Sequence, residues 1–345
     1  MSAPISDDCL QLAYAYGEPA ATARLRVQPE DFFVEEILPF EPSGDGEHVW
    51  LYLEKRERNT ADVAQALARQ AGVSSADIGY SGLKDRRAVA RQWFSLCLHR
   101  DVDMPWHALA GPDVRVLAVT RHTRKLRRGT HSANRFVLRL REVKADAGAL
   151  AECIARVRLH GVPNYFGEQR FGRDCANLRG AVALLSGAYR ERNRHKRGLY
   201  LSAARAHVFN QVLCQRVEAG TWAQALVGDV MVLSGRHGFF TVAEIDDDTR
   251  ARVAGGEITP SGPLWGRGGP AIGPVERDCL AGLHWWTEHL EGYGMKHERR
   301  ALRLSVTELS AQWDDDTTLR LSFVLPRGGF ATAALRELVR TASQP

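Results

Sequence analysis

Residues 48–98 read HVWLYLEKRERNTADVAQALARQAGVSSADIGYSGLKDRRAVARQWFSLCL, and the pattern of this stretch decides the fold class. Apolar and polar residues alternate at 48–54 and again at 92–98, which is typical of strands with one buried face. The segment 60–71 between them has the periodicity of an amphipathic helix. A strand, a helix and a second strand in one short stretch predict a sheet that carries helices.

The helix expected over 60–71 has a signal at each end. Thr60 can cap its first turn, and Gly72 lies where a helix would end in the left-handed conformation. A second helix, expected over 147–159, follows the same design and is stopped by Gly-Val-Pro at 161–163. One face of the first helix carries its apolar residues, namely Val63, Ala64, Leu67 and Ala71.

Two further β-rich runs, at 114–119 and 135–141, extend the strand pattern. We therefore expect the first 160 residues to mix strands and helices around one sheet. The strand pattern returns at 301–309 and 318–325, and an amphipathic helix is expected over 331–343. These C-terminal elements are expected to complete a discontinuous sheet domain formed by 1–160 and 305–345.

The middle of the chain has a different composition. Residues 164–218 read as helical and basic, and 276–300 read as helical again. Between them the chain is rich in glycine, with a short strand expected at 237–245 and a loop over 255–274. This change predicts an inserted α+β domain over 161–304. The expected fold class is α+β, with a mixed, largely antiparallel sheet flanked by helices.

The composition of the chain bounds its class. It has 345 residues, 44% of them hydrophobic and 25% charged, a balance that supports a large core and excludes a disordered chain. No stretch approaches the roughly 18 to 20 apolar residues of a membrane helix, and the N-terminus lacks a signal-peptide pattern. The cysteines show no CxxC or zinc-ribbon spacing, so we expect reduced thiols in a cytoplasmic protein without membrane association.

The segment 79–94, GYSGLKDRRAVARQWF, sets a single acidic residue, Asp85, among basic ones. Its glycines place Asp85 in or next to a loop. One interpretation is a surface salt bridge. The other is a carboxylate kept ionised by neighbouring cations that also hold a polyanion, as a nucleophile acting on RNA requires. The basic neighbours are Lys84, Arg86, Arg87 and Arg91.

Two other basic runs lie at 121–128 (RHTRKLRR) and 190–197 (RERNRHKR). Each alone is more often a solvated face than a binding site. Together with the stretch around Asp85 they segregate positive charge in a chain of net charge +5, which is typical of phosphate binding. We therefore expect a nucleic acid partner. Nearby aromatic residues could stack on unpaired bases, namely Phe32, Phe33, Trp93, Phe94, Phe136, Tyr165 and Phe166.

Other motif classes do not fit the sequence. GRGGPA at 266–271 imitates a dinucleotide-binding loop, but Pro270 is badly placed for the helix that must follow, and no clear strand precedes it. The sequence has no Walker A loop, HExxH or GxSxG motif. We therefore expect no redox cofactor, no ATP chemistry and no metal. Glu35 and Glu36 would point to opposite faces of a strand, which makes them a poor acid/base pair.

Several long motifs resemble those of the TruD family of tRNA pseudouridine synthases, from near residue 10 to the C-terminal helix. The resemblance implies an enzyme that isomerises uridine-13 in the dihydrouridine arm of tRNA to pseudouridine. It implies tRNA as the partner and a two-part molecule with a family-specific inserted domain, and it implies no protein partner in addition to the tRNA substrate. The motifs are PEDFFVEE (29–36), GLKDRRAVARQ (82–92), KLRRGTHSANRF (125–136), GVPNYFGEQRFGRDCANL (161–178), LSAARAHVFNQVL (201–213) and LPRGGFATAALREL (325–338).

The resemblance also implies which residues form the site. The catalytic aspartate falls on Asp85. Lys84 is expected in the substrate-binding set as well, because it is one of the cations beside Asp85 that could hold a polyanion. Arg26 stands where the family's basic partner of the aspartate, commonly lysine, is expected. The residues expected around the target base are Phe32, Asn134, Phe136 and Phe330.

The chemistry explains these residue types. Uridine must be flipped from its stack, and phenylalanine rings can offset the cost of unstacking. Pseudouridine formation then breaks the glycosidic bond, rotates the base and joins C5 to C1′ without net oxidation, so it requires no cofactor. Asn134 could read the uracil edge or stabilise a turn, and Asp85 could act as nucleophile or as the base that removes a sugar proton. Two rivals are a non-catalytic RNA-binding protein and a methyltransferase, which would need a cofactor site that the sequence lacks.

Overall fold

The computed structural model describes residues 9–98, 104–106, 113–235 and 238–341. These residues form two compact units. The first, here called the sheet unit, comprises Ala20–Ile154, Val306–Gly328 and Val339–Pro345. The second, the helical unit, comprises Met1–Pro19, Ala155–Ser305 and Gly329–Leu338.

The sheet unit is built on one sheet with strand order β14-β15-β7-β2-β5-β3-β6, to which β1, β4 and β16 are added at the sides. β2 runs parallel to β5 and β1 to β16, while the other neighbouring strands are antiparallel. The mixed, largely antiparallel sheet is therefore confirmed. The strands are β1 (Thr22–Arg24), β2 (Phe32–Ile37), β3 (His48–Arg56), β4 (Gly79–Tyr80), β5 (Val89–Cys97), β6 (Val114–His122), β7 (Ala133–Lys144), β14 (Thr307–Trp313), β15 (Leu319–Pro326) and β16 (Arg340–Thr341).

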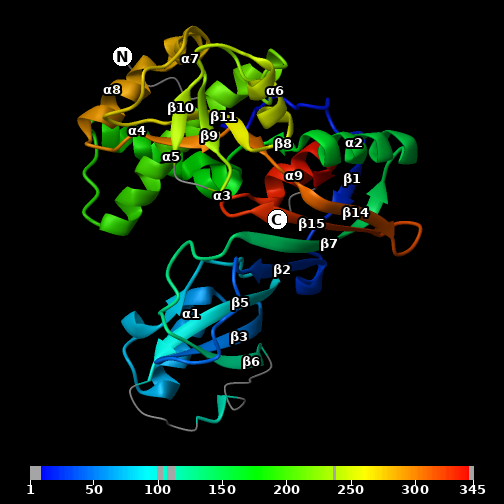
Figure 1. The fold of residues 1–345 in the computed structure, drawn as a ribbon, viewed down its shortest axis with the longest axis vertical. Helices are drawn as coiled ribbons and strands as arrows, with labels where there is room; N and C mark the ends of the chain where they lie inside the picture. The colour runs from blue at the N-terminus through cyan, green and yellow to red at the C-terminus, as the bar shows by residue number, and fades with distance from the viewer. Residues whose placement is uncertain (1–8, 99–103, 107–112, 236–237, 342–345) are drawn as a thin grey trace. The chain divides into compact units, whose positions relative to one another are not determined.

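Helix α1 (Thr60–Ala71) covers the face of this sheet that β3 and β5 present (Figure 1). It ends where expected, because Gly72 takes the left-handed conformation with φ 64°. The expected cap is wrong: Asn59 occupies the N-cap position and Thr60 is the first helical residue. The Thr60 hydroxyl instead donates to the Gln92 side chain on β5 at 2.9 Å. Short 3-10 helices flank this region at Pro29–Asp31 and Ser75–Asp77.

The helical unit is organised around α5 (Arg194–Glu218), which packs against α4, α7, α8 and β11. α2 (Ala147–His160) runs across the boundary between the two units and ends directly before Gly161, as expected. The other helices are α3 (Glu168–Phe171), α4 (Ala176–Leu185), α6 (Asp247–Ala254), α7 (Pro274–Leu280), α8 (His284–Gly292) and α9 (Ala331–Leu338), with 3-10 turns at Arg173–Cys175 and Ala281–Leu283.

Two small antiparallel sheets complete the helical unit. One has the order β10-β9-β11-β12, and the other pairs β8 with β13. The strands are β8 (Val162–Pro163), β9 (Val230–Leu233), β10 (Phe239–Thr241), β11 (Ile258–Leu264), β12 (Glu298–Ala301) and β13 (Arg303–Leu304).

The loop expected over 255–274 is partly wrong, because β11 lies within it and is buried along almost its whole length. Pro260 and Pro263 would normally exclude an inner strand, since proline donates no ladder hydrogen bond. β11 avoids this conflict by dividing its pairing. It pairs with β9 over 258–260 and with β12 over 261–264, so neither ladder needs an unbroken series of donors.

Three other expected boundaries also differ. The helix expected over 276–300 ends at Gly292, and its last residues form β12. The helix expected over 331–343 ends at Leu338, because Arg340 and Thr341 pair with β1 instead, and residues 342 and 343 lie outside the described residues. The strand expected over 237–245 is found over Phe239–Thr241, and residue 237 lies outside the described residues.

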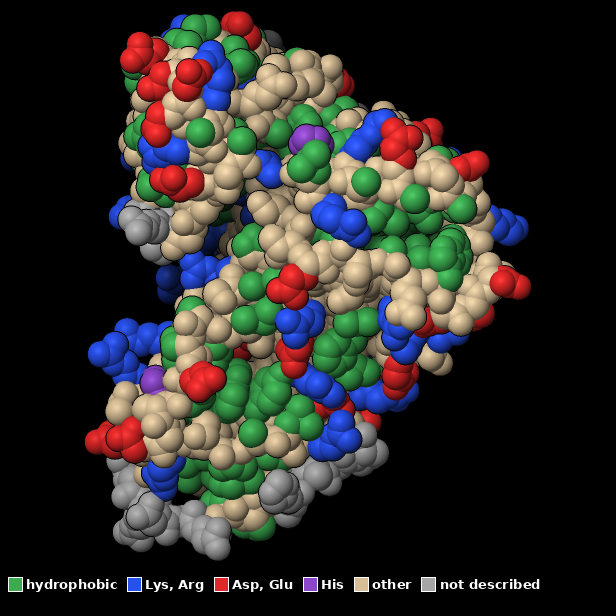
Figure 2. All heavy atoms as spheres, turned by 45° about the vertical axis from the view of Figure 1, so that its right-hand side comes forward, with side chains coloured by type: hydrophobic (Ala, Val, Ile, Leu, Met, Phe, Trp, Pro, Cys, Tyr) green, Lys and Arg blue, Asp and Glu red, His purple; other side chains and the backbone are tan. Residues whose placement is uncertain are grey.

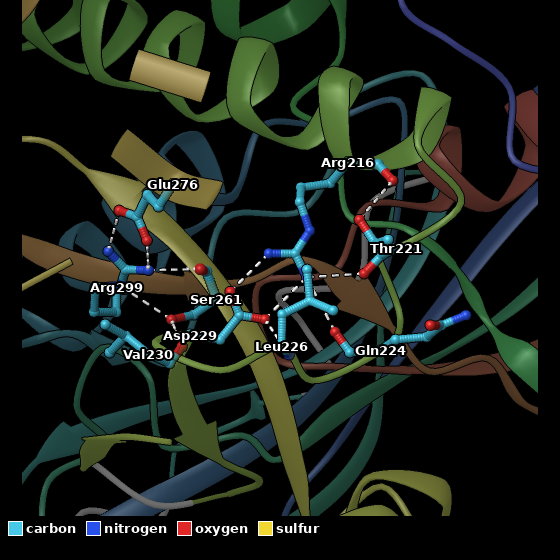
Figure 3. Close-up of polar contacts among 9 residues, drawn as sticks. All are labelled: Arg216, Thr221, Gln224, Leu226, Asp229, Val230, Ser261, Glu276 and Arg299. Atoms are coloured by element: carbon cyan, nitrogen blue, oxygen red, sulfur yellow. Dashed lines mark hydrogen bonds and ion pairs between the residues drawn. The ribbon is translucent and has the colours of Figure 1, made fainter. Parts of the chain in front are cut away.

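The helical unit contains two buried ion pairs (Figure 3). Arg216, on α5, donates to Asp229 at 2.7 and 2.9 Å and to the carbonyls of Thr221 and Gln224. Arg299, on β12, donates twice to Glu276, on α7, at 2.7 Å. All four side chains are 5% exposed or less. The first pair ties α5 to the loop before β9, and the second ties β12 to α7.

The expectation of reduced thiols is wrong for two cysteines. Cys9 and Cys175 form a disulfide with a Cα–Cα distance of 6.3 Å, and they are 166 residues apart in the sequence. Both are buried in the core of the helical unit. Among the described residues, no helix has both the length and the apolar composition needed to cross a bilayer.

Candidate active site

Asp85 lies in the loop between β4 and β5 and forms an ion pair with Arg26, which follows β1. The Arg26 Nη2 is 2.5 Å from the Asp85 Oδ2, and each side chain is 27% exposed. Arg26 has a backbone φ of 58°, a left-handed conformation that is uncommon for a residue other than glycine. Its guanidinium lies 4.0 Å from the centre of the Phe32 ring. Arg26 is therefore held between an aromatic face and the carboxylate.

The alternation of β2 and β7 brings the other expected residues of this unit to one face of the sheet. Glu36 is directly opposite Asn134 in the ladder, and Phe136 is opposite Val34. The rings of Phe32 and Phe136 meet edge to face at 6.0 Å. Glu35, on the opposite face, accepts a hydrogen bond from the Tyr52 hydroxyl at 2.6 Å. The prediction that Glu35 and Glu36 point apart is confirmed.

Lys84 differs from the expectation that the cations around Asp85 hold a polyanion. Its side chain is only 5% exposed, and its ammonium lies 3.2 Å from the Glu36 carboxylate. It donates to the Asn134 Oδ1 at 2.6 Å. Burial disfavours the charged form of both groups, so it lowers the pKa of Lys84 and raises the pKa of Glu36. Lys84 therefore orients the Asn134 amide and presents the amide nitrogen, not the oxygen, as the group still able to bind a ligand.

Lys55, at the end of β3, is a site residue that the sequence reasoning missed. It is 1% exposed, and its ammonium donates to the backbone carbonyls of Asp85 at 2.8 Å and Arg58 at 2.7 Å. Burial lowers its pKa to about 8, an effect that the Asp85 carboxylate partly opposes. The alternation of β3 could have revealed this residue. Positions 49, 51 and 53 are apolar and buried, so a lysine at 55 falls on the same, core-facing side of the strand.

Further contacts fix the loop that carries Asp85. The Lys84 amide donates to the Thr60 hydroxyl at 3.1 Å, and the Gln92 amide donates to the Gly82 carbonyl at 3.2 Å. The Ser81 hydroxyl lies 2.6 Å from the His131 Nδ1. Burial lowers the pKa of His131 to about 4, with a smaller contribution from the nearby cations, so this imidazole is neutral at pH 7. Neighbouring strands, α1 and the segment before β7 thus hold the loop from several sides.

Phe330, the remaining expected site residue, belongs to the helical unit. Its ring lies 6.1 Å from that of Phe166, and the Arg300 guanidinium is 5.7 Å from its centre. Burial lowers the pKa of Arg300 to about 9. Phe330 is partly exposed in this aromatic and basic cluster.

The basic residues near Asp85 divide into exposed and paired groups. Arg86 and Arg87 are exposed, and neither forms an ion pair with another described residue. Arg91 pairs with Glu54 at 2.7 Å, on the opposite face of the sheet from Lys55. On the face of the molecule drawn in Figure 2, basic side chains lie next to acidic ones in several places.

The basic run 121–128 lies in the sheet unit and the run 190–197 in the helical unit. In the first, Arg124 and Arg127 are exposed, while Lys125 donates to the Ala76 carbonyl and Arg128 to the Tyr80 hydroxyl, both at 2.6 Å. The second run includes the first turn of α5, which contains no acidic residue. Cations at this end of a helix oppose its dipole, so this end is suited to an anion.

In the part of the chain that the structure describes, no three His, Cys, Asp or Glu side chains are arranged to hold a metal ion. The site combines the Asp85 carboxylate with the cations of Arg26, Lys55 and Lys84. The rings of Phe32 and Phe136 lie beside them. The fold and site define an α+β protein in which cations hold a partly exposed carboxylate.

Comparison with known proteins identifies the kind of enzyme. The fold matches the crystal structure of a putative tRNA pseudouridine synthase D from Methanosarcina mazei with a TM-score of 0.72, covering 94% of this chain and 95% of that one at 21% identity. The family model for tRNA pseudouridine synthase D (TruD) matches residues 11–191 and 178–338. The chain belongs to the TruD family, and it is a tRNA pseudouridine synthase, an isomerase.

Two curated relatives extend over nearly the whole chain. The tRNA pseudouridine synthase D of Nitrosococcus oceani is 47% identical over 344 residues, which cover 97% of this chain and 96% of the relative. That of Stutzerimonas stutzeri is 45% identical over 345 residues, which cover 99% of each.

Proposed function

We propose that this enzyme converts uridine-13 in the dihydrouridine arm of tRNA to pseudouridine, by flipping the base and using Asp85, without a cofactor. The observation that carries the proposal is the ion pair between Arg26 and Asp85. The loop that carries Asp85 is held by Lys55, which donates to the Asp85 backbone carbonyl. A carboxylate that is fixed in direction but still 27% exposed can reach a ribose placed against it. We infer that the enzyme acts in the cytoplasm, where its tRNA substrate would be found.

Arg26 and Phe32 support the carboxylate in this proposal. Phe32 is 2% exposed and its ring face is covered by Arg26, so we assign it to positioning the guanidinium rather than to stacking on the base. Arg26 in turn directs the Asp85 carboxylate. Its strained backbone is consistent with a functional demand at this position.

Asn134 is the proposed reader of the base. Its oxygen is occupied by Lys84, so its amide nitrogen can donate to a uracil carbonyl. Cytosine carries an amino group in place of the O4 carbonyl, and two donors facing each other would repel it. Phe136 and Phe330 are proposed to contribute apolar surface near the flipped base.

The reaction balances without an external reagent. The C1′–N1 bond breaks, the base rotates, and a C1′–C5 bond forms; C5 loses a proton and N1 gains one. Asp85 serves either as the nucleophile at C1′ or as the base that removes a sugar proton. Neither route changes the oxidation state of the substrate, so a redox cofactor has no role.

The test maps pseudouridine in tRNA from cells that lack this gene and from cells that regain it. We expect the modification to disappear from position 13 alone and to return with the wild-type gene. Purified protein treated with EDTA should still convert an unmodified transcript. Retention of pseudouridine at position 13 in the deletion strain would contradict the proposed site, and a mass increase in the product would indicate methylation.

A further inference from the structure

The helical unit contains a cavity of about 420 Å³ at the glycine-rich segment 266–271, which the proposed reaction does not use. The segment follows β11 directly and precedes α7, so a strand does precede it, contrary to the sequence-based expectation. The lining residues that matter here are Trp265, Arg267, Gly268, Gly269, Glu291 and His297.

The polar groups of this cavity are held in place. The Trp265 indole N–H donates to the Glu291 carboxylate at 3.0 Å. Arg267 Nε donates to the Glu291 backbone carbonyl at 2.5 Å, and the Arg267 amide donates to the Met295 carbonyl at 2.7 Å. One aromatic ring, one carboxylate and one guanidinium are thereby fixed against each other before any ligand arrives.

The glycines let the loop pass close to the His297 ring and take a left-handed turn. A Cβ on Gly269 would lie 2.6 Å from the His297 Nδ1, and Gly268 has a φ of 75°. Both glycines are exposed, and their backbone amides donate to no other residue that the structure describes. Exposed amides in a loop beside an arginine are suited to an anionic oxygen.

His297 contributes a flat, uncharged ring. It meets Trp265 edge to face at 5.3 Å, and its buried Nε2 has no hydrogen-bond partner among the described residues. Burial lowers its pKa to about 4, so the imidazole is neutral at pH 7. The two rings form an apolar wall beside the carboxylate and the guanidinium.

We propose that this cavity binds a single nucleoside monophosphate unit, with its base against Trp265 and His297 and its phosphate at Arg267 and the amides of Gly268 and Gly269. The Glu291 carboxylate can only accept hydrogen bonds, so it favours a base edge with donors. Guanine offers two adjacent N–H donors and is the preferred base. The unit is either an unpaired nucleotide of the RNA substrate, which rests on the proposed function, or a free nucleotide of the same chemistry.

The test uses Arg267→Glu in the full-length protein, with Arg250→Glu as the control. Arg250 lies in the same unit, is 62% exposed and pairs with Asp247, so the same charge change occurs outside the cavity. Binding of GMP and of CMP is measured by calorimetry, and binding of tRNA is measured at several salt concentrations. Gly269→Ala places a methyl group against the His297 ring and so displaces this part of the cavity wall without changing the charge.

We expect Arg267→Glu to weaken tRNA binding by about five- to tenfold and to lower the salt slope by about one, while Arg250→Glu does neither. Pseudouridine formation should not change in Arg250→Glu. GMP binding that is stronger than CMP binding and lost in both cavity variants would establish a free-nucleotide site. Loss of tRNA affinity without measurable GMP binding would assign the cavity to the RNA.

Equal behaviour of Arg267→Glu, Gly269→Ala and Arg250→Glu toward both probes overturns the proposal. The GMP titration does not depend on turnover. A wild-type protein that fails to modify tRNA therefore contradicts the proposed function but leaves the test of the cavity intact.

Discussion

Two clusters of charged side chains in this molecule differ in their balance of positive and negative charge. In the helical unit two arginines face two carboxylates, and each pair is closed by hydrogen bonds of 2.7 to 2.9 Å (Figure 3). In the sheet unit three cations accompany only two carboxylates, and one carboxylate remains partly exposed. The members of the second cluster are Arg26, Lys55, Lys84, Glu36 and Asp85.

The difference separates charges that hold a fold from charges that prepare a site. In a buried pair of one arginine and one carboxylate the two charges compensate each other, and the main effect of the pair is to fix the elements that carry it. In the second cluster the Asp85 carboxylate stays partly exposed beside its cations, so a substrate can still contact it. The following predictions test this contrast by breaking one cluster or the other.

The largest effect is expected for Asp85→Asn, which keeps the shape of the side chain but removes its charge. Turnover should fall below detection, a loss of at least about a thousandfold. Binding of tRNA should persist or tighten, because the surplus of positive charge increases. Pseudouridine formation, tRNA affinity and thermal stability are measured on one preparation. Near wild-type turnover, after deamidation is excluded by mass spectrometry, would contradict a catalytic role and leave Asp85 as the partner of Arg26 in a salt bridge.

The closed cluster should respond in stability instead. Asp229→Asn leaves the Arg216 guanidinium buried and uncompensated, at a cost of about 3–5 kcal/mol in the free energy of unfolding. Urea denaturation measures this loss. Asp247→Asn, at a fully exposed ion pair, is the control and should cost less than about 0.5 kcal/mol. Equal stability of the two variants would show that the buried pair contributes nothing.

Lys55→Met should lower kcat by about 10- to 100-fold with little change in KM, because the Asp85 backbone loses its support. Lys125→Met is the matched control, since Lys125 also donates to a backbone carbonyl of the sheet unit but not near the carboxylate. A purely structural role for Lys55 would lower thermal stability and leave kcat of the folded enzyme unchanged.

Lys55 also predicts a pH dependence in which activity and stability move in opposite directions. Its folded pKa of about 8 lies below the ordinary value of 10.5. Between these values the unfolded chain binds more protons, so this group's contribution to stability rises with pH in that window. Activity should fall through the same window as the charge near Asp85 is lost. The fall near pH 8 should be absent from the residual activity of Lys55→Met.

The smallest effect is expected at the exposed cations. Replacing Arg124 and Arg127 by alanine should lower the slope of log K against log salt by about two, because both guanidinium groups are exposed and form no ion pair with another described residue. Arg252→Ala, which removes a cation already paired with Glu257 at 2.8 Å, should leave the slope unchanged. An unchanged slope in the double variant would make 121–128 a solvated face.

Local rules recovered much of the sheet unit from the sequence. Alternation located β3, β5, β6 and β7, and Gly72 and Gly161 marked the ends of two helices. The same rules failed at β11, because its two prolines and one glycine are typical of a loop although its neighbours bury it. Pairing with distant strands decided that segment, and such pairing is not encoded locally.

The site was recovered unevenly for a similar reason. Resemblance to a family placed Arg26 beside Asp85, and the structure brings them within 2.5 Å. The same sequence gave no sign that Lys84 is buried against Glu36, since a lysine in a glycine-rich loop is normally exposed. The partnership of Cys9 and Cys175 was equally hidden, because spacing along one chain does not reveal pairing across 166 residues.

The Cys9–Cys175 disulfide turns the intervening chain into a covalent ring. That ring includes the whole of Ala20–Ile154, the segment that carries Arg26, Lys55 and Asp85. A protease that cuts this segment once therefore opens the ring without releasing a fragment, and the two pieces separate on a denaturing gel only after reduction. In the oxidised molecule the segment that carries Asp85 therefore has no free end.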